Sequence, residues 1–158
     1  MQGSAFAGGL GLIACCDIAI GVTQAKFAVT EVKLGLIPSV ISPYLAQAIG
    51  PGVARRLFQT AEVFEADEAK LFGLLHEVVD SADLDKTVYK VINSILGNAA
   101  ESNKACKKLI NELGSRTNAE LRAETGRRIA LIRSTDEAQE GISAFFERRS
   151  PRWAEKRN

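Results

Sequence analysis

The sequence predicts an α/β fold, with a core of short strands and helices over residues 1–80 and an all-helical region over residues 81–158. Three observations favour this division. A glycine pair opens an apolar segment that two short extended segments follow, residues 74–79 alternate enough for a last strand, and beyond Leu84 apolar residues recur every three or four positions. With 158 residues, 46% of them hydrophobic, the chain is long enough to bury a core.

The first elements follow directly from the glycine pair Gly8 and Gly9. Residues 10–16 are apolar on every side, which predicts a short buried helix. Residues 17–20 and 26–29 are predicted as short strands, so Glu31 follows the exit of a strand. Loops that leave rigid strands often carry functional groups.

Prolines and glycines mark the next helices. Pro38 and Pro43 bracket a loop, and Pro43 can occupy the first turn of a helix that ends near Gly50. Pro51 then opens another helix. A third short helix is predicted at residues 67–72, because a glycine follows it directly.

The second half of the chain is predicted to be helical. Residues 134–137 form a capping box that starts the final helix. Apolar stripes on these helices have little remaining chain to cover them, so we expect residues 81–158 to form an oligomer interface. The stripes consist of Leu84, Val88, Val91, Ile92, Ile95, Ala105, Leu109, Ile110 and Leu113.

Composition argues against several classes of partner. The formal net charge is +1, from 20 basic and 19 acidic residues, which gives no electrostatic case for nucleic acid or an anionic membrane. Cys15, Cys16 and Cys106 lack metal-ligand or redox spacing. We therefore expect buried, reduced cysteines, no metal, no membrane span and a cytoplasmic location.

Two chemical groups stand out. A glycine pair at a helix start leaves backbone N–H groups that favour a negative charge, although it serves close packing equally well. Glu31, between Thr30 and Val32, is expected to be partly desolvated and suited to proton transfer, although spacing alone also fits a surface glutamate. His76 and Asp17 are predicted to be structural.

The order of these motifs resembles the crotonase superfamily of enoyl-CoA hydratases and isomerases. The resemblance extends over nearly the whole chain, through residues 8–31, 34–38, 49–57, 66–79 and 140–151. It implies a partial ClpP/crotonase-like ββα spiral core followed by a helical region that assembles trimers or hexamers. It also implies a coenzyme A thioester as substrate and no further cofactor.

The resemblance also assigns roles to residues. It matches Gly8 to a backbone amide of the oxyanion hole and Glu31 to the proton carrier. Substrate-binding positions are Gly9, Gly11, Pro38, Ser39 and Val40. Phe145 and Arg148 are matched to contacts with the CoA nucleotide, while the basic stretch 148–157 is equally explained as a solvated helix end.

Two departures from the family pattern suggest different reactions. Gly11 stands where the best-known hydratases carry a second glutamate, which favours a double-bond isomerase with a single glutamate. Residues 39–44, however, resemble methylglutaconyl-CoA and isohexenylglutaconyl-CoA hydratases, whose branched substrates carry their own carboxylate. We favour this hydratase prediction and keep the isomerase as the alternative.

The chain resembles the C-terminal portion of longer family members. In them, the preceding portion supplies the second oxyanion amide and much of the CoA-binding surface. A non-catalytic fragment that only assembles or binds is therefore a third possibility, with little or no hydratase activity of its own.

Overall fold

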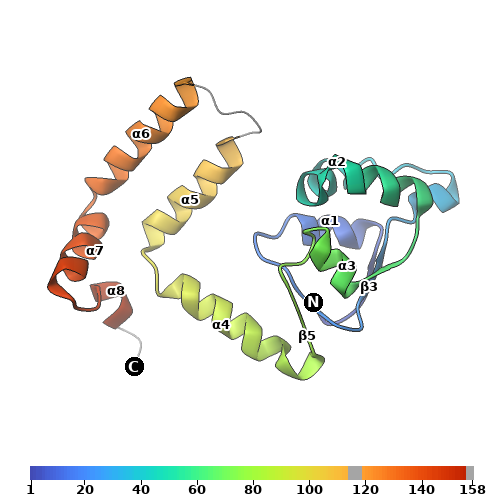
Figure 1. The fold of residues 1–158 in the computed structure, drawn as a ribbon, viewed down its shortest axis with the longest axis horizontal. Coiled ribbons are helices and arrows are strands. Elements are labelled where there is room, and N and C mark those ends of the chain that lie inside the picture. The colour runs from blue at the N-terminus through green and yellow to red at the C-terminus, as the bar shows by residue number, and fades with distance from the viewer. Residues whose placement is uncertain (114–118, 156–158) are drawn as a thin grey trace. The chain divides into compact units, whose positions relative to one another are not determined.

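The computed structural model describes residues 1–113 and 119–155. The chain divides into two compact units, Met1–Val88 and Tyr89–Asn158, and the boundary falls within helix α4 (Leu84–Leu96). Figure 1 shows the helices and strands of both units. In the described residues, no helix is both long and apolar enough to cross a bilayer.

The first unit alternates short strands with helices. Its strands are only two or three residues long, so most of the unit's core comes from helices packed against them. The elements are β1 (Ala5–Phe6), α1 (Gly8–Ala14), β2 (Ile20–Val22), β3 (Lys26–Ala28), the 3-10 helix η1 (Glu31–Leu34), α2 (Ser42–Thr60), β4 (Phe64–Glu65), α3 (Ala66–Leu71), β5 (Glu77–Val79) and the 3-10 helix η2 (Ser81–Asp83).

The strands form two small sheets. In the first, β3 pairs parallel with β1 and antiparallel with β4, and in the second, β2 pairs parallel with β5. His76 extends the second sheet, because its N–H donates to the Ala19 carbonyl at 2.8 Å and its Nδ1 accepts the Ala19 N–H at 3.0 Å. This histidine therefore holds the two strands together.

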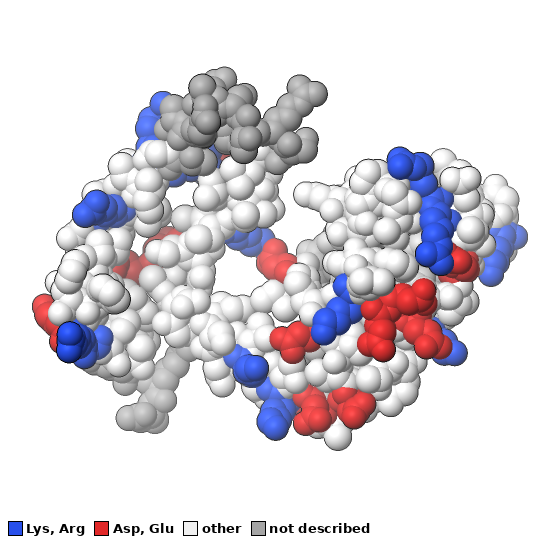
Figure 2. Space-filling model, in the orientation of Figure 1, with Lys and Arg blue, Asp and Glu red and all other residues white. Residues whose placement is uncertain are grey.

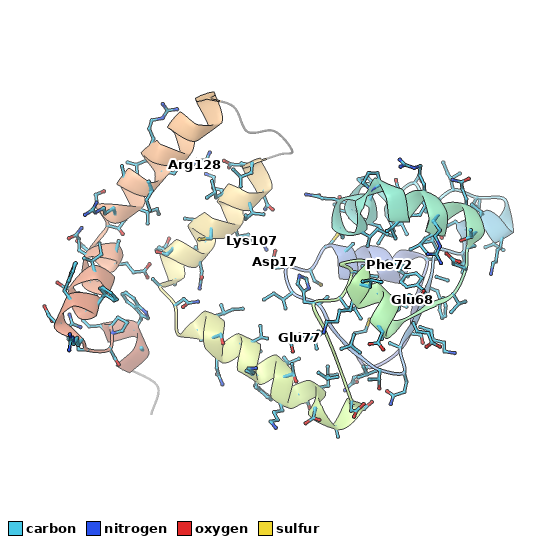
Figure 3. All side chains as sticks on the ribbon, in the orientation of Figure 1. Asp17, Glu68, Phe72, Glu77, Lys107 and Arg128 are labelled. Carbon is cyan, nitrogen blue, oxygen red and sulfur yellow. The ribbon has the colours of Figure 1, made fainter. Side chains whose placement is uncertain are left out.

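Aromatic stacking anchors the core of the first unit. Phe27 on β3 stacks on Phe64 of β4 with ring centroids 5.5 Å apart, and Phe72, just after α3, lies 5.6 Å from Phe64 (Figure 3). Glu65 and Glu68 form a reciprocal capping box that fixes the start of α3. The α/β core predicted from the sequence is thus held by contacts between residues distant in the chain.

Helix α2 runs alongside α1 and carries the predicted break (Figure 1). Gly50 has φ 77° and ψ 154°, outside the helical region, and Pro51 opens the second segment while Pro43 occupies the first turn of the first one. The predicted helix at 67–72 matches α3 within one residue, and Gly73 follows it with φ 88°. These predictions are confirmed.

Three other predictions were wrong. Residues 17 and 18 lie in a bend, and the strand begins only at Ile20. Helix α1 buries only Leu10 and Gly11, because it packs through one face, and Leu12 is 75% exposed. All three cysteines are exposed, since Cys15 and Cys16 follow the last turn of α1 and Cys106 lies on the open face of α5 (Ala100–Leu113).

The second unit is helical throughout its described residues. Carboxylates join its helices. Glu137 accepts the N–H groups of Ala100 and Glu101 at the start of α5, and Arg128 of α6 (Ala119–Arg133) pairs with Glu112 of α5 (Figure 3). Thr135 caps the predicted final helix by accepting the Ala138 N–H. The helices are α4 (Leu84–Leu96), shared with the first unit, α5, α6 (Ala119–Arg133), α7 (Asp136–Glu147) and α8 (Arg152–Glu155).

Glu140 is the buried carboxylate of this unit. Its two oxygens accept bonds from Arg149 at 2.7 and 3.0 Å, and one of them also accepts the Arg152 N–H at 3.0 Å. These donors favour the ionised form. Elsewhere, acidic and basic side chains lie near one another on the face drawn in Figure 2.

The pairing of Glu140 predicts a pH dependence of stability. The side-chain bond from Arg149, followed by the backbone bond from Arg152, lowers the pKa of Glu140 from 4.5 to about 2 in the folded protein. Because the folded pKa is the lower one, the stabilisation is complete above pH 4.5 and is lost as pH falls toward about 2. Urea unfolding followed by circular dichroism should show this loss in the wild type and a smaller one in Glu140→Gln.

Asp85→Asn, which changes an exposed carboxylate on α4, is the matched control and should keep the wild-type pH profile. Equal acid sensitivity of Glu140→Gln and the wild type would contradict the assignment.

Candidate active site

A cavity of about 380 Å³ opens between α1, η1 and the start of α2 in the first unit. It brings together six of the residues singled out from the sequence: Gly8, Gly11, Glu31, Pro38, Ser39 and Val40. The other lining residues were not predicted as site residues from the sequence; they are Leu12, Cys15, Ile37, Ile41 and Tyr44. The only sequence feature that could have identified them is that they lie beside the predicted residues on the same short segments.

Gly8 presents a backbone donor at the edge of this cavity. It is the first residue of α1, so its N–H has no acceptor within the helix, and in the described part of the chain it has none elsewhere. The preceding Ala7 has φ 47° and ψ −121°, and it is held there because its N–H donates to Ala28 and its carbonyl accepts from Leu10. Backbone strain of this kind is often found at functional sites.

Glu31 supplies the acidic group. It is the first residue of η1, and its carbonyl accepts the Leu36 N–H at 3.0 Å across a turn that Gly35 closes with φ 71°. Its Oε2 is buried, and no atom of the described residues hydrogen-bonds to it. Leaving a buried acceptor without a donor costs about 1–3 kcal/mol, so such an atom calls for a functional explanation.

Gly11 and Ile41 form the contact between α1 and the start of α2. A Cβ added at Gly11 would lie 2.5 Å from Cγ2 and 3.1 Å from Cβ of Ile41. The side chain of Ile41 thus occupies the space that any side chain at position 11 would need. The described lining contains one carboxylate, that of Glu31.

The rest of the lining is mostly aliphatic. Cys15 and Tyr44 are its only other ionisable side chains in the described residues. Across residues 1–113 and 119–155, no three His, Cys, Asp or Glu side chains are grouped so as to hold a metal ion. The polar groups that line this cavity are a carboxylate, a backbone N–H, two hydroxyls and a thiol, set among apolar side chains.

Other predicted site residues lie elsewhere. Gly9 does not line the cavity. A Cβ at position 9 would lie 3.3 Å from the Cβ of Ala5, so Gly9 permits close packing against β1. Phe145 and Arg148 belong to the second unit, where Phe145 is 78% exposed and Arg148 ends α7 in the left-handed conformation. Positions 156 and 157 of the basic stretch lie outside the described residues.

Comparison with known proteins identifies the family of this chain. The family model described as enoyl-CoA hydratase/isomerase matches residues 1–156. The chain belongs to this family. A solved enoyl-CoA hydratase from Shewanella pealeana is 44% identical with a TM-score of 0.90, which also shows the crotonase-like fold.

The similarity covers almost all of this chain but only part of each relative. The alignment with the Shewanella structure covers 96% of this chain and 57% of that one. A crotonyl-CoA hydratase from Syntrophomonas wolfei is 34% identical over 99% of this chain and 60% of its own length. The human enoyl-CoA hydratase domain-containing protein 3, named as mitochondrial, is 34% identical over 98% of this chain and 51% of its own length.

The strain at Ala7 predicts an unusual response to glycine. Ala7→Gly should raise the free energy of unfolding by about 1 kcal/mol, because relief of about 1–3 kcal/mol of strain exceeds the roughly 0.5–1 kcal/mol of added chain entropy. Urea denaturation measures this difference. Ala5→Gly on neighbouring β1 is the control and should destabilise, and an equal loss in both variants would contradict the prediction.

Proposed function

We propose that this protein hydrates the double bond of an α,β-unsaturated acyl-CoA thioester. The observation that carries the proposal is the buried, unbonded Oε2 of Glu31 in the same cavity as the free N–H of Gly8. A proton carrier and an oxyanion donor are the two groups that addition to a conjugated thioester needs. Family membership supports the same substrate class.

The proposed reaction proceeds through an enolate. As the oxygen of water bonds to the β-carbon, Glu31 takes one of its protons, and the electron pair of the double bond moves onto the thioester oxygen. The Gly8 N–H donates a hydrogen bond to that oxygen. One such donor is typically worth about 10²–10³ in rate. Return of the proton from Glu31 to the α-carbon re-forms the thioester and completes the addition of water.

The acyl group is a finer proposal. The likeness of residues 39–44 to methylglutaconyl-CoA hydratases favours a branched acyl group, and Ser39 and Val40 of that segment line the cavity. The Syntrophomonas wolfei relative is named for crotonyl-CoA, whose acyl chain is short and unbranched. A cytoplasmic location likewise stays a prediction.

Isomerisation of an enoyl-CoA double bond is the second candidate. It is favoured by the contact of Gly11 with Ile41, which leaves the described cavity with a single carboxylate. One carboxylate suffices to move a proton between two carbons of the substrate. Chromatographic identification of the product, a hydroxyacyl-CoA or a shifted enoyl-CoA, separates the two reactions. A non-catalytic binding role predicts neither product.

Replacement of Glu31 tests the proposal. Glu31→Gln should lower kcat for enoyl-CoA hydration by about 10²–10⁴, because the amide keeps the shape of the side chain but cannot carry the proton. The dissociation constant for a saturated acyl-CoA should change little. A spectrophotometric assay of double-bond loss and a calorimetric titration measure the two quantities.

Glu101→Gln makes the same chemical change on α5 and should leave both quantities unaltered. Near-normal turnover in Glu31→Gln would show that Glu31 is not the proton carrier.

Assembly is proposed for the second unit and the helix that leads into it. Many of their large apolar side chains are exposed, which is typical of surfaces that are covered by another chain. They are Tyr89, Ile92, Ile95, Leu96, Ile110, Ile129, Leu131, Ile142, Phe145 and Phe146. We infer a homo-oligomer, with the trimer or hexamer of the family as the expected states.

Sedimentation velocity at micromolar concentration should therefore show an oligomer. Leu131→Glu, which places a charge on the exposed apolar surface of α6, should shift it toward monomer, whereas Lys104→Glu on α5 should not. A monodisperse wild-type monomer would refute the proposed assembly.

A further inference from the structure

We propose that Ile41, seated on Gly11, sets the size limit for the acyl group, and that the acyl group accepted beside Glu31 carries no charge. This inference rests on the proposed function and narrows its substrate class. It excludes a methylglutaconyl-type acyl group, because that group carries a carboxylate of its own.

The size limit follows from how firmly Ile41 is held. Its side chain is 6% exposed, and its carbonyl accepts the Leu45 N–H at 2.9 Å in the first turn of α2. The preceding turn is closed by the bond from the Ser42 N–H to the Pro38 carbonyl, also 2.9 Å. The backbone around Ile41 therefore cannot move away from a larger ligand without breaking these hydrogen bonds.

Contact with α1 restricts Ile41 from the other side. Its Cγ2 lies so close to Gly11 that not even a methyl group fits between them. Both residues line the cavity that contains Glu31. Ile41 is therefore one of the aliphatic side chains that bound the volume around the Glu31 carboxylate, and its truncation would enlarge that volume without altering Glu31 or Gly8.

The charge preference follows from the lining side chains. Those of α1, η1 and the start of α2 are aliphatic apart from Cys15, Glu31, Ser39 and Tyr44, and no Lys, Arg or His belongs to the described lining. A ligand carboxylate would lie in the same small cavity as Glu31, where the donors are neutral: hydroxyl and thiol side chains and the Gly8 N–H, which the thioester oxygen takes up. A partly buried like charge without a cation is strongly disfavoured.

Calorimetric titration with saturated acyl-CoA thioesters tests the size limit without requiring turnover. In the wild type, affinity should stop rising with chain length along the series butanoyl-, hexanoyl- and octanoyl-CoA. In Ile41→Ala the affinity should keep rising with chain length, by about fourfold for each further methylene that is buried. The same ranking in both proteins would overturn the role of Ile41.

Ile49→Ala is the matched control, because Ile49 on α2 has the same 6% exposure as Ile41 but does not line the cavity. It should keep the wild-type ranking, and an equal shift there would overturn the proposal. Should Ile41→Ala fail to fold by circular dichroism, Ile41→Val provides the same test, with a shift of about fourfold for its single methylene.

The charge preference is tested with pentanoyl-CoA and glutaryl-CoA, whose acyl groups have the same number of carbons. Pentanoyl-CoA should bind at least tenfold more tightly, and equal or tighter binding of glutaryl-CoA would overturn this part of the inference. If no acyl-CoA binds more tightly than CoA itself, the acyl pocket and the inference both fail. Acyl-CoA binding with an unchanged turnover in Glu31→Gln would instead refute only the proposed role of Glu31.

Discussion

The contact of Gly11 with Ile41 is the constraint on which the site depends. It brings α1 against the start of α2 at a distance that only glycine permits. This packing places the N-terminus of α1 and the segment after Pro38 around one cavity, with Glu31 on the connection between them. A residue that looks like a missing carboxylate in the sequence is, in the structure, a close packing contact between α1 and the residue that precedes α2.

The polar groups of the site are held by backbone geometry. Ala7 takes up a strained positive φ so that β1 can turn directly into α1, and Gly35 takes up a positive φ, which glycine adopts without strain, where η1 ends after Leu34. Both turns are tied to the rest of the unit by backbone hydrogen bonds, to Ala28 and to Glu31. Such rigidity allows a carboxylate oxygen and a helix N–H to stay without hydrogen-bond partners among the described residues.

The second unit is organised on a different principle. Carboxylates of one helix bind groups outside that helix. Glu137 accepts N–H groups at the start of α5, and Glu140 pairs with Arg149 and Arg152. Aromatic and aliphatic side chains remain on the outside. A helical layer that satisfies its polar ends internally and leaves apolar surface exposed is well suited to packing against other chains.

Local chemistry allowed the sequence by itself to determine the helix breaks at Gly50 and Gly73, the capped start at Thr135 and the family, because each depends on residues close together in the chain. Tertiary structure alone decided which faces are buried. Residues 10–16 are apolar all round, yet α1 packs through one side only, so Leu12 and the cysteines beside it are exposed. It also decided that Ile41 and Tyr44 line the cavity with Glu31, since they come together only when α2 folds back along α1. Periodicity reports the hydrophobicity of a segment, but which neighbour covers it depends on contacts between residues far apart in sequence.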